Sequence, residues 1–335
     1  MRESNGKFAF FVLVFNHEHY IIEHLESIKY LIENHGANIT FDIVINDDCS
    51  RDSSKLLIDR WLESNSTLFR NVDKLYNPEN IGTCKSIVNM IKVLRSDVDS
   101  FKMTAGDDIY SFENIFAHAF SFNSSSIVSG VPLHFSDRKL YLNLSEFYGM
   151  VSSQYCYEGR PLLQRFKYLS VNNAPNIIYK KELMVSNHVL NFLSEYDVVE
   201  DWPIQIAISE VSPDSDFKLV NKVFVYYRRT SGSVYIVANK RFVQDKLNIY
   251  NYLISSSNSY FEKLVLINRA WLFNLSNRYL NKIFNLSFYI FSIRSLFNLK
   301  NIFLYRKNFS PDISLHNSHL DKIKRRADDF MSGPG

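Results

Sequence analysis

The chain has 335 residues, of which 46% are hydrophobic and 22% are charged, with a formal net charge of +3. This length supports one large hydrophobic core or two modest ones, and the composition excludes a disordered or low-complexity chain. The three cysteines are odd in number and far apart, which excludes a disulfide framework or structural zinc site and is typical of a reducing cytoplasm.

Strand and helix patterns alternate along the first 130 residues. Residues 8–15, FAFFVLVF, are continuously apolar, which predicts a strand buried on both faces rather than a signal peptide. Asn16 is expected to cap the amphipathic helix that follows. The alternation predicts an α/β fold with a mostly parallel sheet and helices on both of its faces. The other expected elements are strands at 41–45, 74–76, 100–104 and 126–131 and helices at 53–64 and 83–94.

Two acidic pairs, Asp47–Asp48 and Asp107–Asp108, follow predicted strands. Ligands bind beyond the carboxyl ends of the strands in such sheets, and paired carboxylates can hold Mg²⁺ or Mn²⁺ against a diphosphate. Alternatively, Asp107 and Asp108 simply cap a helix that follows them. The chain has neither a dinucleotide-binding GxGxxG nor a P-loop, and His17 lacks zinc-binding HExxH spacing, so we interpret it as a surface or cap residue.

The pattern changes near residue 235 to long helical stretches rich in aromatic residues. Residues 240–335 carry 15 Lys and Arg against 6 Asp and Glu, whereas the preceding residues are net acidic. Helices of this type can lie in the headgroup plane of an anionic membrane. Alternatively, they form a subdomain packed on the core, with solvated cations. The sequence has no motif for binding nucleic acid.

Six segments, in chain order, resemble the motifs of a known family. They are VLVFNHEHYIIEHLESI, DIVINDDCSRDSS, NPENIGTCKSIVNMI, TAGDDIYSFENI, VVEDWPIQIAIS and VYYRRTSGSV. The order resembles glycosyltransferase family 2, which has the GT-A fold, and the resemblance covers residues 8–234. Three positions depart from the family pattern: Ala105 replaces the first acid of the DXD motif, Thr230 replaces a histidine, and Val14 replaces a proline.

The resemblance implies roles for individual residues. Asp201 would be the catalytic base, with Glu200 beside it, and the preceding acidic pair Asp107 and Asp108 would hold Mn²⁺ or Mg²⁺. The residues that the resemblance places against the donor nucleotide are Phe15, Asn16, Asp47, Asp48, Lys85, Asp107, Arg228 and Arg229.

The resemblance also implies an overall organisation and function. We expect a GT-A domain at 1–235, with a nucleotide-sugar-binding half at 1–130 and an acceptor half at 131–235, followed by a basic helical region at 236–335. The expected activity is inverting transfer of a hexose from a UDP-sugar to a saccharide, such as an undecaprenyl-diphosphate-linked intermediate of O-antigen or capsule synthesis. The enzyme would be cytoplasmic and peripheral on the inner face of the cell membrane. A sugar nucleotidyltransferase and a non-catalytic saccharide-binding scaffold remain alternatives.

Overall fold

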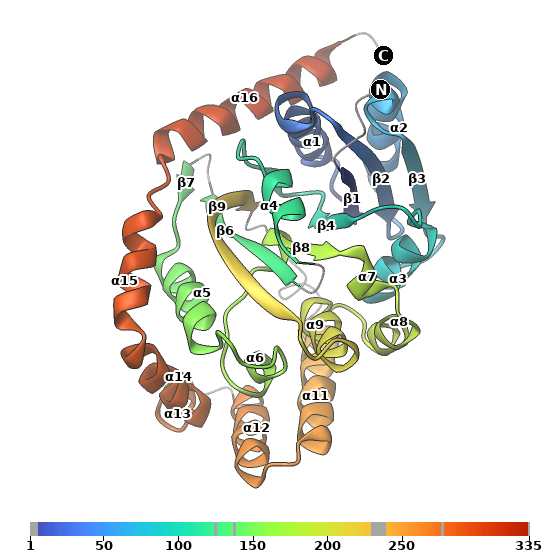
Figure 1. Ribbon diagram of the computed structural model, residues 1–335. Helices are drawn as coiled ribbons and strands as arrows, with labels where there is room; N and C mark the ends of the chain where they lie inside the picture. Colours follow the sequence, from blue (N-terminus) through green and yellow to red (C-terminus); the bar gives the residue numbers. More distant parts are fainter. Residues whose placement is uncertain (1–5, 124–125, 137–138, 229–238, 276–277, 334–335) are drawn as a thin grey trace.

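A single nine-stranded sheet organises the computed structural model, which describes residues 6–123, 126–136, 139–228, 239–275 and 278–333 (Figure 1). The strand order is β3-β2-β1-β4-β8-β6-β9-β5, and β7 pairs with β6. The strands are β1 (Gly6–Val14), β2 (Ile39–Asp47), β3 (Asn71–Tyr76), β4 (Ser100–Ala105), β5 (Ile109–Tyr110), β6 (Ser126–Ser136), β7 (Lys139–Tyr141), β8 (Ile177–Lys180) and β9 (Asp216–Arg228).

The pairing directions divide the sheet. All neighbours within β3-β2-β1-β4 are parallel, and β6 pairs with β9 in parallel. By contrast, β8 is antiparallel to both β4 and β6, and β5 is antiparallel to β9. The predicted α/β class is therefore confirmed, and the parallel pairing is concentrated in the first half, where helices connect successive strands.

Strand β1 shows why the first half of the sheet is buried on both faces. Phe8, Phe10 and Val12 are fully buried in one hydrophobic cluster, whereas Ala9 and Phe11 are fully buried in another on the opposite face. Alternate side chains of a strand point to opposite faces, so an uninterrupted apolar run needs a covering layer on each side.

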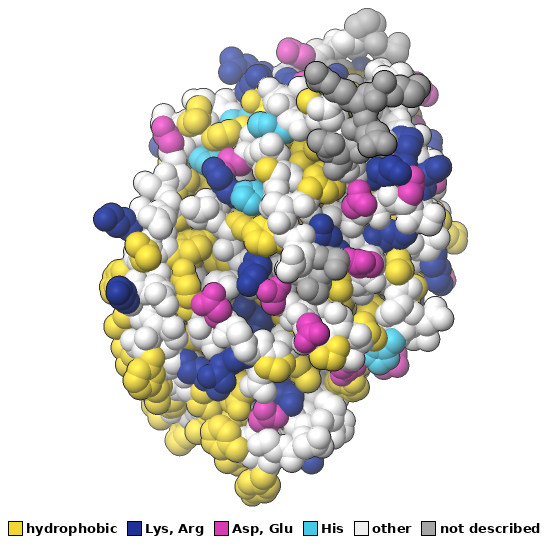
Figure 2. Space-filling view, in the orientation of Figure 1, with side chains coloured by type: hydrophobic (Ala, Val, Ile, Leu, Met, Phe, Trp, Pro, Cys, Tyr) yellow, Lys and Arg dark blue, Asp and Glu magenta, His cyan; other side chains and the backbone are white. Residues whose placement is uncertain are grey.

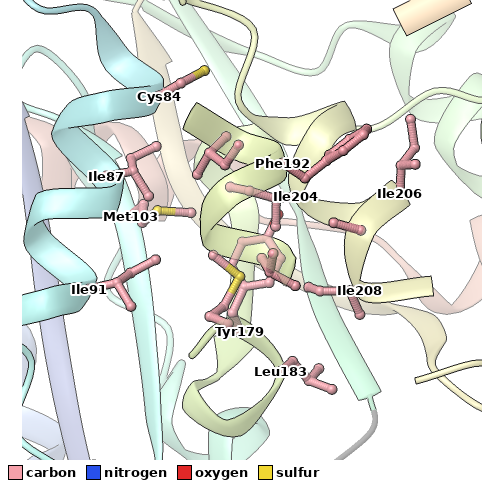
Figure 3. Packing of buried hydrophobic residues seen from close by; sticks show 14 of the residues in the cluster. Cys84, Ile87, Ile91, Met103, Tyr179, Leu183, Phe192, Ile204, Ile206 and Ile208 are labelled. Atoms are coloured by element: carbon pink, nitrogen blue, oxygen red, sulfur yellow. The ribbon is translucent and has the colours of Figure 1, made fainter. Parts of the chain in front are cut away.

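Helices supply both covering layers. One cluster joins β1 to α1, α2 and α4, and the other joins it to α3, α8 and α9. Figure 3 shows the second layer, where isoleucines of α3 and α9 meet Met103 of β4 and Tyr179 of β8. The helices before residue 212 are α1 (Ile21–His35), α2 (Ser54–Asn65), α3 (Thr83–Val93), α4 (Phe116–Ser121), α5 (Leu144–Cys156), α6 (Gln164–Lys167), α7 (Lys181–Met184), α8 (Asn187–Ser194) and α9 (Asp201–Val211), with short 3-10 turns at Ser66–Leu68 and Ala174–Asn176.

The C-terminal helices wrap around this core as an arc that ends against α1 (Figure 1). Ile249 and Leu253 of α11 are fully buried in the cluster that contains α3 and α9. At the other end, Arg326 of α16 forms ion pairs with Glu26 and Glu33 of α1. The helices are α11 (Asn239–Ser256), α12 (Tyr260–Phe273), α13 (Arg278–Ile283), α14 (Leu286–Phe297), α15 (Leu299–Asn308) and α16 (Ile313–Ser332).

Two local predictions are wrong. Asn16 does not cap α1, which begins at Ile21; its backbone has φ of 58° and its side-chain Oδ1 accepts a hydrogen bond from the Arg51 N–H. The residues after Asp108 form β5 instead of a helix, because they pair with β9, and α4 begins only at Phe116. The helix-capping interpretation of Asp107 and Asp108 is therefore excluded.

Two further expectations concern the C-terminal region. The expected boundary at residue 235 lies outside the described residues. Among the helices that the structure describes, none combines the length and apolar character needed to span a bilayer.

Candidate active site

A cavity of about 850 Å³ lies at the carboxyl ends of β1, β2 and β4, and the start of α9 and the first turns of α11 also line it. The loops after the three strands converge here because parallel neighbours end at the same edge of a sheet. Seven residues predicted from the sequence line this cavity: Phe15, Asp48, Asp107, Asp108, Glu200, Asp201 and Arg228.

Four other predicted residues have different positions. Asn16 and Lys85 are exposed, and neither they nor the buried Asp47 belong to the lining of the cavity. Arg229 lies outside the described residues. The predicted contacts of all four with the donor nucleotide stay predictions, and for Asn16, Asp47 and Lys85 the lining of the cavity does not support them.

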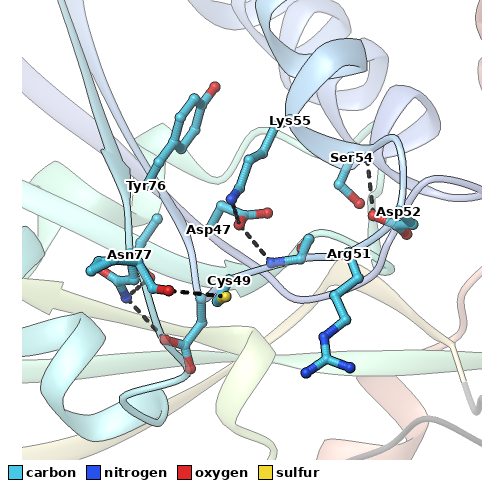
Figure 4. A network of polar contacts seen from close by, with 12 residues as sticks. Asp47, Cys49, Arg51, Asp52, Ser54, Lys55, Tyr76 and Asn77 are labelled. Atoms are coloured by element: carbon cyan, nitrogen blue, oxygen red, sulfur yellow. Dashed lines mark hydrogen bonds and ion pairs between the residues drawn. The ribbon is translucent and has the colours of Figure 1, made fainter.

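The adjacent acids at the end of β2 have different tasks. Asp47 is fully buried; its Oδ1 accepts a hydrogen bond of 2.8 Å from the Ser50 N–H and lies 3.4 Å from Lys55 Nζ (Figure 4). These contacts hold the turn that follows the strand. Asp47 therefore stabilises the loop without lining the cavity, and Asp48 is the member of the pair that lines it.

Asp48 also organises the loop before α3. Its Oδ1 accepts hydrogen bonds from Asn77 Nδ2 at 2.9 Å and from the Ile81 N–H at 2.8 Å, while its Oδ2 accepts one from the Gly82 N–H at 2.9 Å. Gly82 has φ of +87°, and an added Cβ would lie 2.1 Å from Asp197 Oδ1. Only glycine fits this approach of the loop to Asp197.

The second acidic pair is held in place by β9. Arg228 donates hydrogen bonds from its backbone N–H to Asp108 Oδ1 at 2.9 Å and from Nε to the Asp107 carbonyl at 2.7 Å. Its guanidinium also pairs with Glu23 and lies 4.4 Å from the centroid of the Tyr20 ring. Arg228 therefore positions the acidic pair, and much of its charge is already matched by Glu23.

The acidic pair suits a divalent cation that also binds a diphosphate. Asp108 Oδ2 is buried and has no hydrogen-bond partner among the described residues, and burial raises the pKa of this carboxyl well above its ordinary value. Within the described part of the chain, no three Asp, Glu, His or Cys side chains are grouped closely enough to hold a metal by themselves. Mg²⁺ is commonly held by one or two carboxylates together with substrate phosphates, so Asp107 and Asp108 fit this mode of binding.

Glu200 and Asp201 lie at the start of α9 and face the same cavity. Burial, followed by the neighbouring Asp201, raises the pKa of Glu200 to about 8, and burial also raises the pKa of Asp201. Two adjacent carboxylates in a poorly solvated site do not readily ionise together. The arrangement therefore keeps a proton on one member of the pair near neutral pH, and Lys246 favours the ionised form of Asp201.

Helix α11 completes the site with residues that the sequence analysis did not identify. Lys246 lines the cavity with its Nζ 3.7 Å from the centroid of the Trp202 ring, and burial lowers its pKa to about 8. Arg241 also lines the cavity, pairs with Asp197 and donates a hydrogen bond of 3.0 Å to Asn80 Oδ1. No spacing rule connects these positions with the acidic pairs, because they meet only after folding.

Asp245 of α11 fixes the segment that leads into the acidic pair. The Asp245 carboxylate is buried and accepts hydrogen bonds from the N–H groups of Asp197, Val198 and Val199, at 3.0, 2.7 and 3.0 Å to Oδ2. Three donors converging on one carboxylate define the direction in which the chain enters α9. The position of Glu200 therefore depends on a helix that begins almost 40 residues later in the chain.

His17 was also misinterpreted from the sequence. It is partly buried and lines the cavity, and its Nδ1 has no hydrogen-bond partner among the described residues. Its location beside Gly106, where an added Cβ would lie 3.1 Å from Nδ1, places it next to the acidic pair. The interpretation as a surface residue is wrong, because the loop turns back towards β4. The alternative interpretation as a cap residue agrees with the His17 carbonyl, which accepts a hydrogen bond of 2.9 Å from the N–H of Ile21, the first residue of α1.

The arrangement of strands and helices is a GT-A-like fold, as in the glycosyltransferases to which this chain is structurally similar. The chain is similar to residues 1–349 of S. aureus TarS in complex with UDP, with a TM-score of 0.53 and 15% identity over 96% of this chain and 92% of that one. It is also similar to the mannosyltransferase PcManGT from Pyrobaculum calidifontis in complex with GDP-Man and Mn²⁺, with a TM-score of 0.58 and 12% identity over 97% of this chain and 87% of that one.

A longer TarS structure matches with a TM-score of 0.53 and 16% identity, and this chain spans 54% of its length. The sequence matches no protein-family model and no curated protein sequence. At these identities the similarity establishes the fold, and the activity must be argued from the site.

Proposed function

We propose that the protein is an inverting, metal-dependent glycosyltransferase of the family 2 type that uses a UDP-sugar. The observation that carries this proposal is the meeting of two acidic centres in one cavity: Asp107–Asp108 at the end of β4 and Glu200–Asp201 at the start of α9. A transferase needs one centre to hold the charged donor and another to activate the acceptor. The cavity combines both.

Asp201 is the proposed general base. Inverting transfer is a direct displacement, so the acceptor hydroxyl must lose its proton as its oxygen attacks the anomeric carbon. The C–O bond to the nucleoside diphosphate then breaks, and the electron pair leaves with the diphosphate. The raised pKa of Glu200 leaves this neighbour protonated near neutral pH, which allows Asp201 to accept the proton.

The donor is proposed to lie along the loops of β1, β2 and β4. Phe15 is 45% exposed at the cavity and would offer a ring for the nucleobase, while Asp48, which also lines the cavity, would contact the ribose. Asp107 and Asp108 would hold Mn²⁺ or Mg²⁺, which would supply positive charge to balance that of the leaving diphosphate. UDP and Mn²⁺ are each present in a structurally similar protein, which supports this choice.

A screen of nucleotide-sugars tests the function. Purified protein is incubated with UDP- and GDP-sugars, with and without Mn²⁺ or Mg²⁺, and release of nucleoside diphosphate is measured. We expect release from a UDP-sugar only with metal, and its acceleration by a saccharide acceptor. NMR of the product would show inversion at the anomeric carbon. The identity of the hexose and the surface-polysaccharide acceptor would follow from the most active pair.

Two results would contradict the proposal. Pyrophosphate release from a nucleoside triphosphate would assign the protein to the sugar nucleotidyltransferases, and saccharide binding without turnover would assign it to non-catalytic scaffolds. The metal assignment has its own control: calorimetry should show that Asp108→Asn loses metal-dependent UDP binding. An unchanged Mn²⁺ dependence in that variant would reject Asp108 as a ligand.

A further inference from the structure

The residues that the structure describes leave a broad apolar face on the C-terminal arc uncovered. On α12, the exposed Tyr260, Leu264, Ile267 and Trp271 follow one another at intervals of four, three and four residues, which places them on one side of the helix. The ring of Trp271 lies 6.4 Å from that of Phe284, which joins this side to the turn before α14. The face therefore continues from one helix to the next.

The same face extends over α14 and α15. Ile293, Leu296 and Phe297 of α14 and Phe303 of α15 are exposed, and Phe297 is 86% exposed. Figure 2 shows hydrophobic side chains gathered at the lower left, over α12 to α15 in the orientation of Figure 1. Contiguous apolar surface of this extent usually marks an interaction site.

The opposite sides of these helices are packed against the protein. On α12, Arg269 donates a hydrogen bond to the Phe166 carbonyl and lies 5.3 Å from the centroid of the Trp202 ring. On α14, the Arg294 guanidinium lies 4.6 Å from the centroid of the Tyr168 ring. Each helix therefore has one side held by the core and one side free, as in helices that rest on a surface.

The charge of the region indicates what covers the apolar face. Residues 260–309 contain eight Lys and Arg but only one acidic residue, Glu262. The single carboxylate is already neutralised, because Glu262 lies 2.6 Å from Lys167 Nζ. Lys300 and Lys307 of α15 are exposed beside the apolar side chains. Exposed aromatic and aliphatic side chains with flanking cations match the interface of an anionic bilayer.

We infer that the exposed side of α12, α14 and α15, termed here the apolar face, binds the surface of an anionic phospholipid bilayer. The apolar side chains enter the boundary between headgroups and acyl chains, and the lysines contact anionic headgroups. This inference locates membrane contact on three helices, whereas α11 and α16 are committed to the core. It therefore refines the expectation that the whole basic tail lies on the membrane.

The apolar face also lies close to the cavity. Arg269 on the inner side of α12 contacts Trp202, which directly follows Asp201 in the chain. Helix α12, about 10 Å across, therefore carries the apolar face on one side and contacts the residue next to the proposed base on the other. A saccharide attached to a membrane lipid would be presented near the proposed base, which deepens the proposed function by favouring a lipid-linked acceptor.

Cosedimentation with vesicles tests the inference on the full chain. We expect binding to phosphatidylcholine vesicles that contain phosphatidylglycerol, and weaker binding to pure phosphatidylcholine or at high salt. The double substitution Phe297→Ser and Phe303→Ser should weaken binding about tenfold or more, because two large apolar side chains are lost from the contact. Lys300→Glu with Lys307→Glu should abolish the preference for phosphatidylglycerol.

Matched controls lie elsewhere on the surface. Leu56→Ser on α2 and Lys92→Glu on α3 replace residues of the same kinds that are exposed away from the apolar face, and vesicle binding should be unchanged. Binding that survives the phenylalanine and lysine substitutions, or no vesicle binding at all, would overturn the inference. So would a dimer in solution that depends on Phe297 and Phe303 and binds no vesicles, since a second copy would then cover the face.

The test is independent of catalysis. Vesicle binding needs neither donor nor acceptor, so a failure of membrane binding would leave the proposed transfer activity standing. Conversely, an inactive protein could still bind vesicles through the apolar face. The two proposals therefore fail separately.

Discussion

The three charged groups at the catalytic end of the cavity, Glu200, Asp201 and Lys246, form a coupled set. Glu200 and Asp201 are adjacent, Lys246 approaches them from α11, and Trp202 lies beneath the lysine. Burial disfavours every charge in this set, so the ionisation of each group depends on its neighbours. Removing one group should therefore alter the pH dependence of the others.

Asp201→Asn should abolish transfer while donor binding persists. A general base acts on the acceptor in the transition state, so its loss should lower kcat by about a hundredfold or more and leave the UDP-sugar affinity nearly unchanged. Steady-state kinetics and calorimetry measure the two quantities. Glu200→Gln is the matched comparison and should be milder. If Glu200→Gln is the inactive variant instead, the base is Glu200.

Lys246→Met should shift the acid limb of the kcat/KM profile to higher pH. The Lys246 cation lowers the pKa of Asp201, so its removal raises that pKa further and requires a higher pH to ionise the base. Lys240→Met, at an exposed position on the same helix, is the control. An unshifted profile would mean that Lys246 does not act on Asp201.

At the scale of elements, α11 belongs to the catalytic machinery as much as to the C-terminal arc. Its first turns supply Arg241 to Asn80 in the loop before α3, Asp245 to the segment before α9, and Lys246 to the cavity. Because α11 binds both loops, it holds the part of the cavity proposed to bind the donor at a defined distance from the proposed base Asp201. Truncating the chain before α11 should therefore remove both membrane binding and the site.

Asp245→Ala should lower both stability and turnover. The three backbone N–H groups that now donate to the carboxylate would be left without an acceptor in a buried place, which costs about 2–4 kcal/mol. Urea denaturation measures this loss, and transfer assays measure the displacement of Glu200 and Asp201. Gln244→Ala, at the exposed neighbouring position, should change neither. A stable, active Asp245→Ala protein would show that the segment holds its shape alone.

At the scale of the whole molecule, α16 closes the arc on the face of the sheet near α1. The Tyr226 hydroxyl of β9 lies 2.9 Å from His316 Nδ1 and 3.2 Å from His319 Nδ1. The ring of Tyr30 on α1 lies 4.6 Å from the ring of His319. Two histidines thus connect the last helix to β9, and His319 also connects it to the first helix, so this contact should respond to acid.

His319 should make the fold sensitive to acid. Burial, together with His316 and the nearby Lys322 and Arg326, lowers its pKa to about 3 from an unfolded value of 6.5. Because the unfolded chain takes up the proton first, the contribution of the neutral histidine is complete above pH 6.5 and is lost as pH falls towards 3. The free energy of unfolding should fall by up to about 1.4 kcal/mol per pH unit in this window.

The substitution His319→Phe measures this contribution. Phenylalanine keeps the ring among its aromatic neighbours but cannot take up a proton, so the stability curve from urea denaturation should be flatter below pH 6.5. His19→Phe, where the histidine side chain is 79% exposed, should leave the slope as it is. An unaltered slope in His319→Phe would assign the acid sensitivity to other groups.

The sequence by itself determined the strand pattern of the first half and the acidic pairs at its strand ends. An uninterrupted apolar run such as residues 8–15 is stable mainly as a strand that is covered on both faces. Ligands bind beyond the carboxyl end of such a strand. The order of motifs also predicted that Asp108 and Asp201 share a site, and the structure places both in one cavity.

Only the tertiary structure decided which of these residues reach the cavity and what surrounds them. Asp47 and Asp48 are neighbours with the same side chain, yet they have different surroundings. Asp47 accepts a hydrogen bond within the turn that follows the strand, whereas Asp48 lines the cavity. Lys246 and Asp245 belong to α11, which follows the last of the six motifs in the chain and packs against the start of α9. No local sequence pattern predicts this contact. Contacts between residues far apart in the chain form only when the whole chain folds. These contacts therefore determine the charges around the proposed base Asp201 and decide which helix sides stay exposed as the apolar face.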